Sequence, residues 1–226
     1  MRLLKLVNSP YFGFPERIVK VTQAISLIGS KELQNFVLAT LIVDKFSAQP
    51  EGMITMAEFW AASVRSALMA KSLAQALPSQ LPADLESVFI CGLLHDIGKL
   101  VFYRRIPEIT RQVDLLVGQN NEADFEIERR LLGFDHYDAG AELARLWQLP
   151  NLITETIGQH AKPNPDNPHG QIADLVRSAN LASKLELPEA VLGFQDWGLS
   201  DEALSRMLDE VQEQFFEVFS IFYPAL

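Results

Sequence analysis

Helical spacing of apolar residues runs through nearly the whole chain, and this pattern constrains the fold more than any other feature. Between residues 85 and 100 apolar side chains recur every three or four positions, as on one buried face of a helix. No run of strict apolar and polar alternation bounded by hairpin turns occurs. The sequence therefore predicts an all-α, multi-helix bundle without a sheet. Its predicted helices cover residues 31–46, 56–76, 85–100, 109–117, 122–132, 137–147, 152–160, 172–185 and 201–219.

A break in this pattern divides the chain into two parts. Ala48-Gln49-Pro50-Glu51-Gly52 contains a proline and a glycine and lacks helical periodicity. We predict a small N-terminal helical subdomain over residues 1–48 and a larger helical bundle with a C-terminal helical extension over residues 53–226. Because 48% of the 226 residues are hydrophobic, the chain has ample material for a core.

Charge and composition exclude several classes of partner. The net charge of −10 repels phosphate backbones, so no nucleic-acid partner is expected. No segment approaches the roughly 20 uninterrupted apolar residues that cross a bilayer, so no membrane association is expected. The single cysteine, Cys91, rules out an internal disulfide and fits a reducing compartment. Together these features predict a cytoplasmic protein.

A histidine and an aspartate stand together within the most apolar part of the chain. His95-Asp96 lies between Leu93-Leu94 and Ile97, and burying both side chains is costly unless they are paired, hydrogen-bonded or bound to a metal. Neutral imidazole and carboxylate are common ligands of zinc, manganese and iron. Two interpretations therefore remain open from these residues alone: a hydrogen-bonded core pair and a metal centre.

An ordered set of motifs extends over about residues 3 to 185. It begins with Leu3-Leu4-Lys5-Leu6-Val7-Asn8-Ser9-Pro10-Tyr11-Phe12-Gly13, Gln23-Ala24-Ile25-Ser26-Leu27-Ile28-Gly29 and Phe59-Trp60. It continues with Gly92-Leu93-Leu94-His95-Asp96-Ile97-Gly98-Lys99, Glu128-Arg129, Gly133-Phe134-Asp135-His136, Gly140-Ala141-Glu142-Leu143, Trp147-Gln148-Leu149-Pro150 and His160 shortly before Pro163. In this order the motifs resemble the HD-related output domain (HDOD), a branch of the HD/PDEase superfamily of metal-dependent phosphohydrolases. The resemblance implies a helical bundle of the HD-domain type.

The same resemblance implies a metal centre that has lost ligands. Catalytic HD enzymes hold their ion with an early histidine, the His-Asp doublet and a late aspartate. The early position here is Ala62 and the late position is Asn180. An alanine cannot ligate, and a neutral amide oxygen is a poorer ligand than a carboxylate.

Four residues remain as candidates for a vestigial metal site. They are the doublet His95 and Asp96, together with His136 and His160, which match positions that supply extra ligands in two-metal HD enzymes. Structural roles compete with this interpretation, since His136 directly precedes a predicted helix, whose start it could cap, and His160 ends another. No bound cofactor is the primary expectation, and a divalent transition metal is the alternative.

We therefore predict a bacterial signal-transduction output module that binds other proteins and carries a degenerate, non-catalytic HD site. The alternative is a metal-dependent phosphohydrolase acting on nucleotides or cyclic dinucleotides. The family context implies regulatory protein partners, including cyclic-dinucleotide or two-component signalling proteins.

The N-terminal segment leads to a prediction about self-association. Family members usually carry helices before the segment that matches residues 3–13, and this sequence does not show them. Leu3, Leu4, Leu6 and Val7 are therefore expected to form an exposed apolar strip. Such a strip predicts weak homo-oligomerisation.

Overall fold

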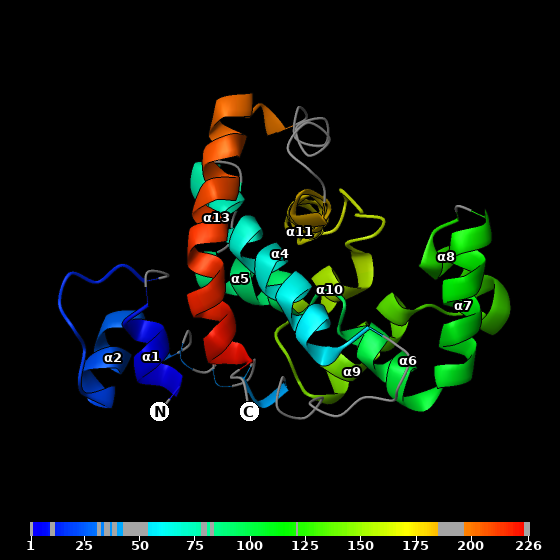
Figure 1. Ribbon diagram of the computed structural model, residues 1–226, viewed down its shortest axis with the longest axis horizontal. Coiled ribbons are helices and arrows are strands. Elements are labelled where there is room, and N and C mark those ends of the chain that lie inside the picture. The colour runs from blue at the N-terminus through cyan, green and yellow to red at the C-terminus, as the bar shows by residue number, and fades with distance from the viewer. Residues whose placement is uncertain are drawn as a thin grey trace.

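Helices make up all the regular structure of the described chain, and no strand occurs in it (Figure 1). The computed structural model describes residues 2–9, 12–30, 33, 37, 40–42, 54–77, 81, 84–120, 122–184 and 197–223. The predicted all-α fold is confirmed. The helices are α1 (Arg2–Val7), α2 (Val21–Ile28), α4 (Met56–Ala76), α5 (Leu85–Leu94), α6 (Ile97–Arg105), α7 (Pro107–Asn120), α8 (Asp124–Leu132), α9 (His136–Leu146), α10 (Asn151–Gln159), α11 (Gly170–Lys184) and α13 (Asp201–Phe222).

Helix α4 forms the centre of the main core. The side chain of Thr55 accepts a hydrogen bond from the backbone of Glu58, and the Glu58 side chain accepts one from the backbone of Thr55, a capping box that starts the helix. Its alanines and serines let neighbours approach closely, and α5, α11 and α13 all pack against it. Most side chains of α4 are buried as a result. None of the described helices has the length and apolar character needed to cross a membrane.

The prediction of one helix over residues 85–100 is wrong. Helix α5 starts after the N-cap Asp84 and ends at Leu94, and α6 begins at Ile97. Apolar periodicity continues through the junction because both helices bury a face, so the pattern hides the change of direction. The doublet therefore lies at a bend, with His95 closing α5 and Asp96 preceding the first turn of α6.

Two glycines let α6 and α9 approach each other. A Cβ atom added at Gly98 would lie 1.7 Å from the backbone oxygen of His136 and 2.8 Å from the backbone nitrogen of Gly140. No side chain can be accommodated at such distances, so glycine is required at position 98. This contact brings the first residue of α9 next to the doublet.

The N-terminal helices have a small apolar cluster of their own. Val7, Ile18, Ala24 and Ile28 are buried in it, with Leu4 partly buried against them. The predicted apolar strip is therefore wrong for Val7, which packs inward, and the side chains of residues 3 and 6 lie outside the described part. The predicted helix over residues 31–46 and the boundary at residues 48–52 fall largely or wholly outside the described residues, so the division into 1–48 and 53–226 stays a prediction.

The C-terminal helix α13 packs against the main core. Helix α13 packs along α4, and its Phe222 ring lies 5.8 Å from the ring of Phe89 between centroids. Figure 1 shows α1 and α2 at one end of the molecule and α7 and α8 at the other. The candidate site lies between these ends, where α5, α6, α9 and α10 meet.

Candidate metal centre

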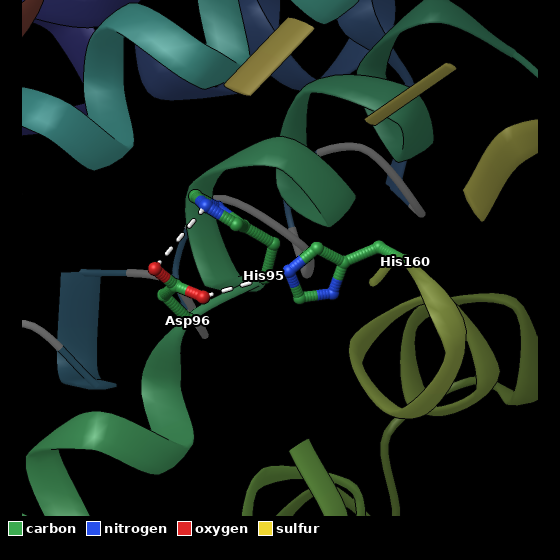
Figure 2. Close-up of side chains that lie close together, drawn as sticks. All are labelled: His95, Asp96 and His160. Atoms are coloured by element: carbon green, nitrogen blue, oxygen red, sulfur yellow. Dashed lines mark ion pairs between the residues drawn. The ribbon is translucent and has the colours of Figure 1, made fainter. Parts of the chain in front are cut away.

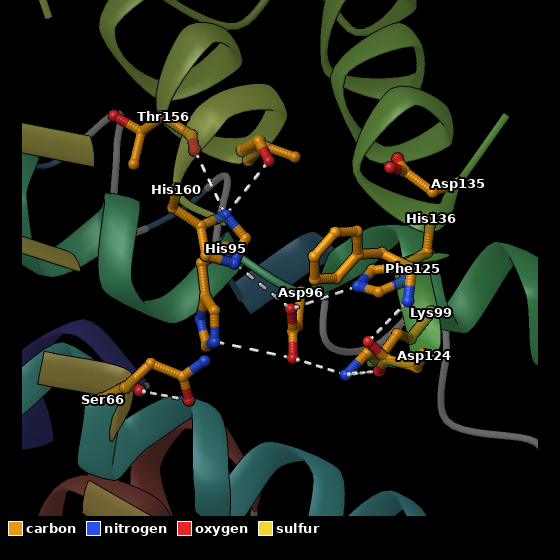
Figure 3. Close-up of polar contacts among 12 residues, drawn as sticks. Ser66, His95, Asp96, Lys99, Asp124, Phe125, Asp135, His136, Thr156 and His160 are labelled. Atoms are coloured by element: carbon orange, nitrogen blue, oxygen red, sulfur yellow. Dashed lines mark hydrogen bonds and ion pairs between the residues drawn. The ribbon is translucent and has the colours of Figure 1, made fainter. Parts of the chain in front are cut away.

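Three histidines and one aspartate that lie far apart in the sequence meet in the interior. His95 and Asp96 come from the bend between α5 and α6, His136 from the start of α9 and His160 from the end of α10. Their exposed fractions are 2%, 7%, 0% and 2%, respectively. Figure 3 shows the three imidazoles arranged around the carboxylate of Asp96. The structure thus brings together all four residues that the sequence indicated.

The imidazole nitrogens lie just beyond hydrogen-bond length from Asp96. The Nε2 atoms of His160 and His136 are 3.5 Å and 3.7 Å from Asp96 Oδ1, and His95 Nε2 is 3.6 Å from Asp96 Oδ2. Figure 2 shows the close contacts of His95 and His160 with the two oxygens of this carboxylate. One carboxylate therefore lies at the centre of the group.

Hydrogen bonds on the far side of each ring select its tautomer. His95 Nδ1 lies 2.7 Å from the Gly92 carbonyl oxygen, and His160 Nδ1 lies 3.1 Å from the carbonyl oxygen of Ile157. A carbonyl oxygen only accepts, so each Nδ1 carries a hydrogen, and an imidazole that is neutral in this tautomer has its lone pair at Nε2. Burial lowers the pKa of His95 to about 3, which keeps this ring neutral.

His136 is held by a buried glutamate rather than by a carbonyl. Its Nδ1 lies 2.6 Å from Glu128 Oε2, and its backbone nitrogen donates to the same oxygen at 2.8 Å. Burial alone would lower the pKa of His136, but the carboxylates of Asp96 and Glu128 raise it above its ordinary value. Glu128 is itself only 4% exposed, so it fixes the ring from inside the core.

Four buried polar atoms at this centre have no hydrogen-bond partner among the described residues. They are the Nε2 atoms of His95, His136 and His160, and Asp96 Oδ1. Buried polar atoms left unpaired are costly, and a divalent transition metal would satisfy imidazole nitrogens and a carboxylate oxygen together. Ligand atoms of His95, Asp96 and His160 lie within 4.8 Å of one another, as ligands of one ion do. The donor set therefore fits such a metal.

The central carboxylate of Asp96 is paired with a lysine, which would compete with a metal ion for it. Lys99 Nζ lies 3.1 Å from Asp96 Oδ2 and 2.9 Å from Asp124 Oδ2. Burial alone would raise the pKa of Asp96, but the positive charge of Lys99 helps hold it well below its usual range. Since Lys99 already compensates its charge, Asp96 offers a cation less attraction than an unpaired carboxylate would.

The two positions where the resemblance implies lost ligands lie on helices that pack together. Asn180, on α11, accepts a hydrogen bond at its Oδ1 from the Ser66 hydroxyl on α4, at 3.3 Å. Ala62 stands one helical turn before Ser66 and so shares its face of α4. Ala62 supplies no donor atom, and the amide oxygen of Asn180 is already used.

The sequence did not assign roles to three residues that build the centre. Glu128 and Asp124 hold His136 and Lys99, and the Tyr137 ring lies 3.9 Å from that of His136 and 4.6 Å from that of His160, between centroids. The available sequence signal for Glu128 was its position three residues from both Phe125 and Leu131, which places it on the apolar side of a predicted helix. Its partner on another helix could not be read from spacing.

Comparison with known proteins identifies relatives over most of the chain. The model of the HDOD domain matches residues 1–163. An uncharacterised protein of Treponema pallidum (strain Nichols) is 26% identical over 201 residues, which are 85% of this chain and 38% of that protein. The chain thus spans well under half the length of this relative.

Solved structures share the fold at low sequence identity. A candidate phosphohydrolase of Shewanella amazonensis SB2B has a TM-score of 0.78 at 23% identity, covering 98% of this chain and 81% of that one. An HDOD domain protein of unknown function from Geobacter sulfurreducens has a TM-score of 0.74 at 22% identity, covering 99% and 82%. A candidate signal transduction protein of Marinobacter aquaeolei VT8 has a TM-score of 0.72 at 21% identity, covering 98% and 51%. At these identities the likeness shows the fold.

Proposed function

Because the chain belongs to the HDOD family, we propose that it is a signal-transduction output module, which works by binding regulatory proteins and does not hydrolyse phosphodiesters. The description of the Marinobacter protein as a candidate signal transduction protein agrees with this role. Two-component or cyclic-dinucleotide signalling proteins are the proposed partners.

The burial of the centre is the observation that carries the proposal. His95, Asp96, His136 and His160 are between 0% and 7% exposed. Hydrolysis requires the phosphorus atom of the substrate to reach a water next to the metal, and a charged phosphodiester is strongly disfavoured in such an interior. A closed centre supports a structural role for these residues.

The missing ligands support the same conclusion. A divalent metal, when bound, would supply Lewis acidity and an activated water, and His95, Asp96, His136 and His160 would hold it. Neither Ala62 nor Asn180 adds a charged oxygen or an imidazole to this set. We propose that the four residues are the remnant of a catalytic centre.

The unpaired atoms favour a second candidate function, a metal-dependent phosphohydrolase acting on nucleotides or cyclic dinucleotides. Three imidazole nitrogens and one carboxylate oxygen converge without a hydrogen-bond partner in the described part of the chain. The description of the Shewanella amazonensis SB2B protein as a candidate phosphohydrolase agrees with this alternative.

A phosphodiesterase assay separates the two functions. The full chain, purified without chelators, is incubated with bis-p-nitrophenyl phosphate and with a cyclic dinucleotide in the presence of Mn²⁺. We expect no release of product above that of the His95→Ala variant. His169→Ala is the matched control, because His95, His136 and His160 are buried in the metal centre and His169, the fourth histidine of the sequence, is not part of it. Turnover by the wild type and His169→Ala, lost in His95→Ala, would contradict the output-module proposal.

Complementation gives a positive test of the signalling role. In a bacterium that carries this protein, deletion of its gene is complemented with the wild type or with His95→Ala, after circular dichroism has established that the variant folds. Equal rescue of the deletion phenotype is the expected result, since protein binding does not need a working metal centre. Rescue by the wild type alone would argue for the hydrolase.

A further inference from the structure

Helices α7 and α8 form an arm, residues 107–132, that packs outside the main hydrophobic core. Figure 1 shows the two helices side by side at one end of the molecule, and their main packing partners outside the arm are α6 and α9. Among the described residues of the arm, only Val113 and Ile127 are buried apolar side chains, and neither belongs to the apolar cluster around α4. Because the free energy gained from burial scales with apolar area, this burial attaches the arm only weakly.

Both ends of the arm are suited to act as hinges. Ile106 ends α6 outside the helical conformation, and Pro107 begins α7 directly after it. Gly133 ends α8 with φ at 81°, in the left-handed region, and a Cβ atom there would meet nothing within 4 Å. Glycine adopts many backbone conformations at little cost, so the arm can turn at these positions while α6 and α9 stay packed together.

Polar contacts hold α8 in place, and the buried ones end at the metal centre. Asp124 Oδ2 lies 2.9 Å from Lys99 Nζ, and Figure 3 shows Lys99 between the carboxylates of Asp124 and Asp96. Glu128 Oε2 accepts from the backbone nitrogen of His136 at 2.8 Å and lies 2.6 Å from its Nδ1. The centre is thus connected to α8 by an ion pair and by a buried carboxylate.

The contacts of α8 with Lys99 and His136 are costly to break. Both partners are already part of the polar network of the centre, since Lys99 Nζ also lies 3.1 Å from Asp96 Oδ2. Separating Glu128 from His136 in the interior would leave an uncompensated charge. The arm therefore stays docked as long as Lys99 and His136 keep their positions at the centre.

We propose that residues 107–132 form a detachable arm, which the metal centre keeps docked through Lys99 and His136. In the open state the arm turns about Ile106-Pro107 and Gly133 while the rest of the bundle stays folded. This gives a non-catalytic centre a regulatory use, and in that respect the inference rests on the proposed function.

Native-state hydrogen exchange of the full chain, read out by mass spectrometry of peptic fragments, tests the inference. In the wild type, protection factors in α7 and α8 should be at least about tenfold lower than in α4, because the arm opens without global unfolding. Asp124→Asn removes the charge that pairs with Lys99 and keeps an oxygen that accepts from the backbone of Phe125. It should lower protection in the arm about tenfold further and leave α4 unchanged. Glu128→Gln, at the second contact, should have the same effect.

Glu126→Gln is the matched control. It removes the same charge from the first turn of α8, where the carboxylate is 48% exposed and pairs with Lys162 at 3.7 Å instead of with the centre. Its protection factors should match those of the wild type within about twofold, since exposed ion pairs contribute little.

Three results would overturn the inference. Equal protection of α8 and α4 in the wild type would mean that the arm opens only on global unfolding. Equal loss of protection in α4 and α8 in both Asp124→Asn and Glu128→Gln would indicate a general loss of stability. Unchanged protection of the arm in both variants would mean that these contacts do not hold it. Hydrogen exchange measures neither signalling nor hydrolysis, so failure here is distinguishable from failure of the proposed function.

Discussion

Hydrogen bonds to the Nδ1 atoms orient the three imidazoles of the metal centre, with no need for a bound ion. Gly92 and Ile157 accept from two imidazoles through their carbonyl oxygens, and Glu128 holds the third. These bonds direct every Nε2 toward Asp96, which is the arrangement that metal ligation requires. Two features lower the affinity of the centre for a metal ion: the pairing of Asp96 with Lys99, and the absence of an imidazole or carboxylate ligand at positions 62 and 180.

Restoring the two missing ligands should raise metal affinity. We expect the wild type to bind Mn²⁺ or Zn²⁺ weakly, and Ala62→His with Asn180→Asp to bind at least about tenfold more tightly. Calorimetric titration measures both affinities, with His169→Ala as the unchanged control. Tight binding by the wild type that disappears in His95→Ala would contradict the vestigial model.

Lys71 is expected to make stability depend on pH. Burial lowers its pKa to about 8, so the folded state prefers the neutral amine more than the unfolded state does. Below that pH the folded protein bears the full cost of the buried charge. The cost is relieved as pH rises from about 8 toward the ordinary lysine value near 10.4, so stability should increase across this window.

Lys71→Met should abolish most of this rise and stabilise the protein at neutral pH by about 1–3 kcal/mol. Urea unfolding at about pH 7 and about pH 9.5 measures the effect. Lys162→Met is the control, since that side chain is 74% exposed and its removal should change stability by less than about 0.5 kcal/mol. If the pH dependence of stability is unchanged in Lys71→Met, Lys71 is not the group that causes the rise in stability with pH.

At the scale of helices, one crossing decides the geometry of the centre. Gly98 of α6 faces the backbone of His136 and Gly140 in α9, and this contact joins the Asp96 bend to the start of α9. The capping box of Asp135 and Asp138 begins α9 at the position that directs His136 inward. Helix ends therefore supply all four residues of the centre.

Gly98→Ala should separate α6 from α9. The added Cβ would meet backbone atoms at 1.7 Å, so we expect a loss of about 3 kcal/mol or more in the free energy of unfolding. Gly118→Ala is the matched control, because nothing lies within 4 Å of its Cβ in α7, and it should stabilise by about 0.5–1 kcal/mol. Urea denaturation compares the two, and similar effects would refute the close-crossing argument.

At the scale of the whole molecule, the N-terminal helices form a separate apolar cluster beside the main core. Val7 and Ile28 are buried in this cluster. Three apolar side chains of the same region nevertheless face solvent: Val19, Val21 and Leu27, which are 64%, 49% and 50% exposed. These residues replace the N-terminal strip as the physical basis for association between copies.

Weak self-association through this region is the expected behaviour of the full chain. Sedimentation velocity should show a sedimentation coefficient that rises with concentration, and Val19→Lys with Leu27→Lys should remove the rise. Leu146→Lys provides the control, since this leucine is 71% exposed on α9, well away in sequence. A monomer at every concentration, or equal loss of association in the control, would contradict the prediction.

Local features of the sequence determined the helical fold and most helix boundaries. Periodicity predicted α4 at residues 56–76, Asp84 caps α5 and Gly29 ends α2, because caps and apolar faces act within a few residues of one another. The doublet was recognisable because two polar side chains in an apolar run need partners. Only the tertiary structure decided that the chain bends at Asp96, that Glu128 holds His136, and that Lys99 neutralises the central carboxylate. These features depend on which helix ends meet in space. The close crossing of α6 and α9 at Gly98 brings those ends together, and it results from packing between segments that are distant in the sequence.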